Sequence, residues 1–151
     1  MCCDKYKALF DKGDECYDSN TSATEKGKTY RIEIKDKSER FCRIKIDGCV
    51  IPEESKKKCD YLFVRCKTED LYFIELKGKH GLDEAYNQIE QTILYFASKI
   101  QNNNKFGRIV GATVPSGTKG QNLSKKYKNK FRKHGQLIIH SGSIFTENKF
   151  L

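Results

Sequence analysis

Apolar and polar residues alternate with a period of two in the first half of the chain. The stretches 29–35 (TYRIEIK) and 41–46 (FCRIKI) both follow this pattern, which predicts two half-exposed β-strands. Asp47-Gly48 then precedes the apolar residues 49–51, and an Asp-Gly pair between apolar runs favours a hairpin turn. Pro52 and the charged residues after it end this unit.

Two later stretches, 59–66 and 71–77, are apolar at nearly every position instead of at alternate positions. This pattern is typical of central strands that are covered on both faces of a sheet. Residues 67–70 connect the two stretches, so we expect a hairpin at the centre of the protein.

Helical spacing is clearest between residues 82 and 100, where one stripe of apolar side chains recurs at steps of three and four: Leu82, Ala85, Ile89, Ile93, Phe96 and Ile100. Shorter helices are predicted at 4–11 and 121–133. Further strands are predicted at 106–114 and 137–140.

The order of these elements is helix, three or four antiparallel strands, helix, strand, helix, strand. This order predicts an α/β (α+β) fold in which helices flank a mixed central sheet. Residues 1–28 are expected to form an N-terminal helix and a polar loop, and residues 29–151 the rest of a single domain.

The chain has 151 residues, a formal net charge of +9 and a pI near 9.2. A small domain this basic is expected to bind a polyanion, of which nucleic acid is the commonest; simple solubility is the alternative explanation. The sequence has no apolar stretch of about eighteen residues, so we expect no membrane span. No secretory signal is visible at the N-terminus, and we therefore expect a cytoplasmic protein.

The seven cysteines form an odd set without any C-x-x-C pair, which argues against a zinc site and against a complete disulfide framework. Cys42, Cys59 and Cys66 lie within apolar, strand-like stretches, where a free cysteine packs as a small hydrophobic residue. We therefore predict reduced, structural thiols. No pattern places Cys2 and Cys3.

Three charged residues interrupt the two central strands: Asp60, Glu75 and Lys77. If the connection between the strands holds an even number of residues, even positions of the first strand face odd positions of the second, and the three side chains share one face. The two carboxylates and the backbone carbonyl of Leu76 are oxygen ligands suited to Mg²⁺, and Lys77 can act on water or on the transition state. A cross-strand salt bridge at a sheet end is the alternative.

Asp60, followed fifteen residues later by Glu75-Leu76-Lys77, resembles the motif of the PD-(D/E)xK nuclease superfamily. The resemblance covers residues 40–115 and implies a restriction-endonuclease-like fold for the nuclease-like part, residues 29–151. It also implies Mg²⁺ held by Asp60 and Glu75, and a polar residue, commonly glutamine, on the next helix. Gln88 is our candidate for that residue.

The chain departs from the superfamily pattern at two points. Cys59 stands where the motif often has proline, and an additional upstream acid is not identifiable, with Glu33, Glu53 and Glu54 as candidates. A second triplet of the same form, Glu33-Ile34-Lys35, follows Asp18 by the same spacing. Because Asp18 lies in a polar stretch, we interpret this second triplet as an exposed strand face.

The predicted helix at 121–133 carries a cluster of basic residues: Lys125, Lys126, Lys128, Lys130, Arg132 and Lys133. Leu123, Tyr127 and Phe131 would pack inward and leave the basic side chains around them in solvent. Such a surface is typical of sequence-independent, salt-sensitive contact with phosphates. A solvated helix face without a partner is the alternative.

Taken together, these patterns predict a Mg²⁺-dependent DNA nuclease, most simply an endonuclease, with Mn²⁺ expected to substitute for Mg²⁺. Asp60, Glu75, Lys77 and Gln88 are its expected catalytic residues. A non-catalytic module that keeps the nuclease fold and binds nucleic acid or protein is the alternative. The sequence does not separate DNA from RNA, and it is compatible with a homodimer or a larger complex.

Overall fold

The computed structural model describes residues 2–77 and 81–150. The elements are, in chain order, α1 (Cys2–Phe10), η1 (Asp14–Cys16), β1 (Tyr17–Asp18), β2 (Ser22–Glu25), β3 (Lys28–Ile32), β4 (Phe41–Lys45), β5 (Tyr61–Arg65), β6 (Leu71–Leu76), α2 (Leu82–Tyr95), η2 (Ala97–Lys99), β7 (Lys105–Val110), α3 (Gly117–Phe131), β8 (Gly135–His140) and β9 (Ile144–Glu147). None of the described helices combines the length and the apolar character needed to cross a bilayer.

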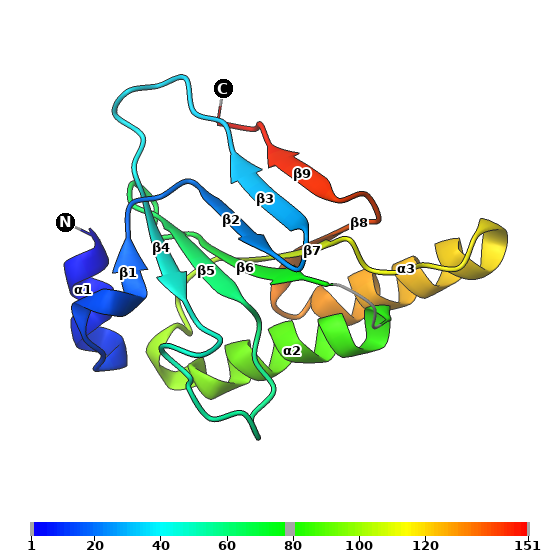
Figure 1. The fold of residues 1–151 in the computed structure, drawn as a ribbon, viewed down its shortest axis with the longest axis horizontal. Coiled ribbons are helices and arrows are strands. Elements are labelled where there is room, and N and C mark those ends of the chain that lie inside the picture. Colours follow the sequence, from blue (N-terminus) through cyan, green and yellow to red (C-terminus); the bar gives the residue numbers. More distant parts are fainter. Residues whose placement is uncertain (1, 78–80, 151) are drawn as a thin grey trace.

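The main sheet has the strand order β1-β4-β5-β6-β7-β8. Its first four strands pair antiparallel, whereas β6, β7 and β8 run parallel, which makes the sheet mixed. Helices α1, α2 and α3 lie on one face, and a small sheet of order β2-β3-β9 covers the other face (Figure 1). The mixed α/β class and the predicted order of the central elements are thereby confirmed.

Strands β5 and β6 lie at the centre of the main sheet, as their apolar sequences predicted. Leu62, Val64 and Phe73 belong to the core shared with the helices. Phe63 and Ile74 point the other way and belong to the core shared with the small sheet. Because both faces are covered, every position along these strands except Arg65, at the end of β5, is buried, and this explains why the sequence shows no alternation there.

The predicted hairpin at Asp47-Gly48 is wrong, because β4 pairs with β5 instead. Gly48 adopts a left-handed conformation (φ 79°) in a tight turn, where the Ile51 N–H donates to the carbonyl of Ile46 at 2.9 Å. Ile46, Val50 and Ile51 are all buried in the core on the helical side. The apolar residues 49–51 therefore pack as a closed turn and do not form a returning strand.

Residues 12–28, expected to be a polar loop, contain two strands. β1 pairs with β4, and β2 forms a hairpin with β3. Strand β9 was not predicted either, although it pairs parallel with β3. Its Glu147 is buried and accepts hydrogen bonds from Arg108 at 2.6 Å and from Tyr30 at 3.0 Å. A strand that buries a partnered carboxylate does not show the apolar pattern by which strands are predicted.

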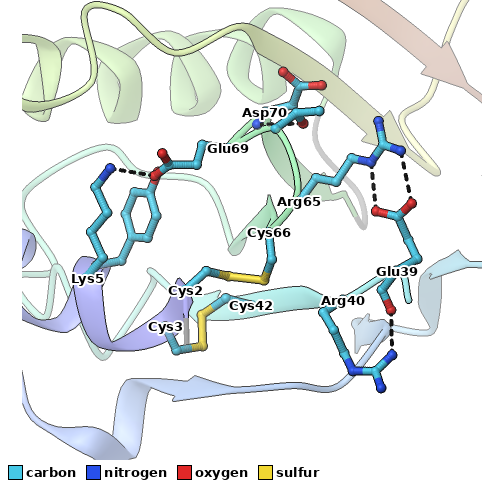
Figure 2. Close-up of a disulfide and its surroundings, with 12 residues drawn as sticks. Cys2, Cys3, Lys5, Glu39, Arg40, Cys42, Arg65, Cys66, Glu69 and Asp70 are labelled. Atoms are coloured by element: carbon cyan, nitrogen blue, oxygen red, sulfur yellow. Dashed lines mark hydrogen bonds and ion pairs between the residues drawn. A yellow bond between two sulfur atoms is a disulfide. The ribbon is translucent and has the colours of Figure 1, made fainter. Parts of the chain in front are cut away.

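The prediction of reduced thiols is wrong for six of the seven cysteines, all of which lie within the described residues. Disulfides join Cys2 to Cys66, Cys3 to Cys42 and Cys16 to Cys49. Figure 2 shows the first two side by side, tying α1 to β4 and to the end of β5. Cys59 is free and buried, as predicted. The bridges join segments that are 64, 39 and 33 residues apart, so their pairing depends on tertiary contacts that the apolar pattern does not encode.

Candidate active site

Asp60 and Glu75 lie opposite each other at the end of the β5–β6 hairpin. The register pairs Tyr61 with Ile74, and the Asp60 N–H donates to the carbonyl of Ile74 at 3.1 Å. Even positions of the first strand therefore face odd positions of the second, which confirms that Asp60, Glu75 and Lys77 share a face. All three residues are at most 4% exposed.

Glu75 is fully buried, and neither of its carboxylate oxygens has a hydrogen-bond partner among the residues that the structure describes. The ammonium of Lys77 lies close by, with its Nζ 3.9 Å from Oε2 of Glu75. Burial raises the pKa of Glu75 well above its ordinary value, the neighbouring carboxylate of Asp60 adds to this, and Lys26 and Lys77 oppose it. Burying a carboxylate without hydrogen-bond partners costs free energy, and a bound cation would offset that cost. The arrangement therefore fits a cation-binding site.

Asp60 is held in a fixed orientation by the adjacent strand. Its Oδ2 accepts a hydrogen bond from the Leu76 N–H at 2.8 Å, and its Oδ1 lies 3.6 Å from Nζ of Lys26. Burial raises the pKa of Asp60, although the Leu76 N–H and the Lys26 ammonium both lower it. Oδ1 thus faces the same space as Glu75, with a lysine as its cationic neighbour.

Lys77 and Gln88 contact each other directly. Nζ of Lys77 donates to Oε1 of Gln88 at 2.8 Å and also lies 3.2 Å from a carboxylate oxygen of Glu84. Both partners lie on α2, whose first turns therefore fix the ammonium next to Glu75. The four residues expected to be catalytic from the sequence are thus brought together in one site.

Helix α2 is positioned against the start of β5 by a short chain of hydrogen bonds. The Cys59 N–H donates to Oγ1 of Thr92 at 2.8 Å, and the Thr92 hydroxyl donates to the carbonyl of Gln88 at 2.8 Å. Cys59 directly precedes Asp60 in the chain, and Gln88 accepts the hydrogen bond from Lys77. These bonds therefore couple the placement of Gln88 to that of the strand that carries Asp60.

Sequence reasoning missed Glu84, which pairs with Lys77, and three further charged neighbours of the site: Lys26, Glu25 and Asp47. Nζ of Lys26 donates to the carbonyl oxygen of Leu76 at 3.3 Å. The carboxylates of Asp47 and Glu25 both act on Asp60 electrostatically. Lys26 and Glu25 come from the β2–β3 hairpin, in the stretch expected to be a loop, so no sequence signal placed them here.

Of the three acids considered from the sequence, Glu33 and Glu53 are exposed, and Glu54 lines a cleft beside the site. Glu33 and Lys35 of the second triplet are exposed, as expected, but the expected strand face is wrong, because β3 ends at Ile32. Asp18, fifteen residues before Glu33, pairs with Arg43 at 2.6 Å. It lies in strand β1, not in the polar loop that we expected.

A cleft of about 550 Å³ opens next to the site. Its described lining combines acidic residues, basic residues and one of the candidate catalytic side chains: Asp47, Glu54, Ser55, Lys56, Lys57, Lys58, Glu84 and Gln88. Lys56 and Lys57 are exposed, whereas Lys58 is buried and lies 3.7 Å from Asp47. The cleft therefore leads from basic surface residues to Gln88.

The basic helix was predicted at 121–133, whereas α3 spans Gly117–Phe131. It therefore starts four residues earlier than predicted, and Arg132 and Lys133 follow its end. All six basic residues of the predicted cluster are exposed, and Tyr127 and Phe131 pack inward as expected. The Tyr127 hydroxyl donates to Asp83 in the first turn of α2. The helix thus runs beside α2 (Figure 1), close to the end of α2 that carries the candidate site.

Not all six basic side chains are equally available to a ligand. Lys133 pairs with Glu90 at 2.9 Å, and the ammonium of Lys130 lies 5.3 Å from the ring centroid of Tyr86. Lys125 and Lys128 line a second cleft, of about 500 Å³, at the start of α3. These two lysines are therefore the better candidates for contacts with phosphate.

Among the described residues, Glu15, Cys16 and Cys49 also bring possible ligand atoms within 4.8 Å of one another. Cys16 and Cys49 form a disulfide, however, and a metal-binding cysteine must be a thiolate. This cluster is therefore a covalent link and not a metal site.

No protein-family model matches the chain, and no curated protein or solved structure matches it. The chemistry of the site must therefore be argued from its own geometry.

Proposed function

We propose that the protein is a Mg²⁺-dependent nuclease that hydrolyses phosphodiester bonds in DNA, with a site of the PD-(D/E)xK type on a restriction-endonuclease-like fold. The observation that carries this proposal is the buried Glu75 carboxylate, which lies opposite Asp60 and beside Lys77 and has no hydrogen-bond partner within residues 2–77 and 81–150. Helix α2 supports it, because it follows the motif and carries Gln88, the polar residue that the resemblance implies on the next helix.

The donor atoms around Glu75 fit a hard divalent cation. Carboxylate oxygens of Asp60 and Glu75 and the carbonyl oxygen of Leu76 would hold Mg²⁺, with Mn²⁺ as a substitute. When bound there, Mg²⁺ lowers the pKa of a bound water and offsets negative charge on the scissile phosphate. The chain holds the two carboxylates in position: the Leu76 N–H orients Asp60, and Glu75 is fixed within β6.

Lys77 acts next to the carboxylates. Its ammonium, held by Gln88 and Glu84, can orient the attacking water or stabilise the charge that develops on the phosphate. Gln88 is a positioning residue for Lys77 in this scheme. The cleft beside Gln88 gives the substrate a route that passes the exposed Lys56 and Lys57.

The proposal is tested by cleavage of supercoiled plasmid, linear duplex, single-stranded DNA and RNA with Mg²⁺, Mn²⁺ or EDTA. We expect metal-dependent cutting of DNA by the wild type. Asp60→Asn and Lys77→Met should each lower the rate by about a thousandfold, which corresponds to roughly 4 kcal/mol of transition-state stabilisation. The second triplet supplies matched controls, since Glu33→Gln and Lys35→Met make the same chemical changes on an exposed segment and should leave the rate unchanged.

Two other results would change the conclusion. Cleavage confined to RNA would keep the chemistry and replace the substrate. DNA binding without any cutting or metal binding would identify a non-catalytic nucleic-acid-binding module.

The proposed DNA contact of α3 predicts a specific salt dependence. Replacing both Lys125 and Lys128 with glutamine should reduce the slope of log affinity against log salt by about two, because each lysine that neutralises a phosphate contributes about one unit. Fluorescence anisotropy of a labelled duplex across a NaCl series measures this slope. Lys133→Gln is the matched control, since Lys133 is paired with Glu90 and should change the slope less. An unchanged slope in the double variant would rule out this surface as the DNA contact.

A further inference from the structure

The β2–β3 hairpin places a lysine directly over the candidate metal ligands. Nζ of Lys26 donates to the carbonyl oxygen of Leu76 at 3.3 Å and lies 3.6 Å from Oδ1 of Asp60. These are two of the oxygen atoms that would hold the divalent ion. The ammonium therefore occupies the position in which a bound cation would contact both oxygens.

The conformation of the hairpin places Lys26 in its turn. Strand pairing ends at Glu25 and Lys28, so Lys26 and Gly27 alone form the turn. Both have positive φ, 55° at Lys26 and 75° at Gly27. A left-handed conformation is unfavourable for a lysine, and such strain persists where the surrounding structure enforces it.

Contacts on both sides hold the turn over the site. On one side, the carboxylate of Glu25 lies 3.5 Å from the Tyr61 hydroxyl and 3.8 Å from Nζ of Lys45. On the other side, the side chain of Lys28 packs against Gly111. A Cβ added at Gly111 would lie only 2.4 Å from Cδ of Lys28. Gly111 is itself left-handed (φ 80°) and follows β7, so the turn spans the main sheet from β5 to β7.

We propose that Lys26 is a tethered cation that occupies the metal position in the metal-free protein and that Mg²⁺ must displace in order to bind. This inference rests on the proposed function, because it concerns the affinity of the same site. An ammonium and a divalent ion cannot share contacts to Leu76 and Asp60, so metal binding breaks both contacts of Lys26. The side chain is 47% exposed and has solvent into which it can move. Lys26 thereby stabilises the paired carboxylates without metal and lowers the apparent affinity for Mg²⁺.

The experiment is a titration of the full chain with Mg²⁺ alone, without substrate, followed by calorimetry and by the Mg²⁺-dependent rise in melting temperature. Lys26→Met keeps the aliphatic stem and removes the charge, and it should bind Mg²⁺ about tenfold more tightly, since a charge-assisted hydrogen bond no longer has to be broken. Lys26→Arg keeps the charge and should stay close to the wild type. Lys28→Met removes one charge from the same hairpin, away from Asp60, and should change the affinity by no more than about twofold.

A second variant controls for the case in which Lys26→Met does not fold because of the strain at the turn. Lys26→Asn removes the ammonium and places a residue in the turn that tolerates a left-handed conformation, so it should fold and also bind Mg²⁺ more tightly. If the wild type binds Mg²⁺ and both neutral variants bind it equally or less tightly, the role of Lys26 is disproved while the metal site stands. If none of the proteins binds Mg²⁺, the metal site itself is disproved, and the role of Lys26 with it.

Discussion

Glutamine in place of Glu75 is expected to make the metal-free protein more stable and, in the same variant, to abolish metal-dependent cleavage. The carboxylate is fully buried without hydrogen-bond partners in the described part of the chain, and its pKa is raised because burial penalises the charge. Glutamine keeps the shape and removes that charge, although its amide still has to be buried. We expect a gain of about 2 kcal/mol, or roughly 4–8 °C in melting temperature. Calorimetry in EDTA measures the gain, and the plasmid assay measures the loss of activity.

Glu39 provides the matched control for this substitution. It is also buried, at 4% exposure, but Arg65 donates to both of its oxygens, at 2.7 and 2.9 Å. The hydrogen bonds from Arg65 lower the pKa of Glu39, so the charged form stabilises the fold and Glu39→Gln should lower the melting temperature. This loss should be complete above the unfolded-state pKa of about 4.3 and should disappear as the pH falls through the lower folded-state pKa. Destabilisation by both substitutions would show that Glu75 is an ordinary structural carboxylate.

The part of the site that could be predicted from the sequence is the part that lies within one hairpin. Asp60 and Glu75 are joined by a short connection, so the alternation of side chains alone was enough to place them on one face. The burial of these strands on both faces was also visible in the sequence, because such burial requires an apolar residue at nearly every position. Gln88 follows on the next helix and was found by its place in the motif.

Lys26 could not be found in the same way. It reaches Leu76 from 50 residues away in the chain, through a hairpin of the second sheet. Strand β2 and the turn after it are rich in polar residues, because β2 buries only one side chain, and this part of the hairpin therefore resembled a loop. Contacts between two sheets depend on how the sheets pack, and no periodicity along either segment encodes that packing.

The disulfides lead to the second large effect: reduction should destabilise the protein severely. The three bridges attach α1 and η1 to β4, to the end of β5 and to the turn at Cys49 (Figure 2 shows two of them). Loss of one native bridge costs about 2–5 kcal/mol, whereas a domain of this size is stable by about 5–15 kcal/mol. We therefore expect a reductant to lower the melting temperature by roughly 15 °C or more. Scanning calorimetry with and without reductant measures the difference.

Thiol counting gives the most direct test of the pairing. The protein unfolded in denaturant without reductant should react with iodoacetamide at one cysteine, Cys59, and at all seven after reduction. Cys59→Ser should then leave no reactive thiol before reduction. Seven reactive thiols without reductant would instead restore the prediction of reduced cysteines. The same count also tests the location of the protein, because disulfides persist in oxidising compartments and are rare in the cytoplasm, where the sequence led us to expect it. One reactive thiol in protein taken from its native source would favour an oxidising compartment.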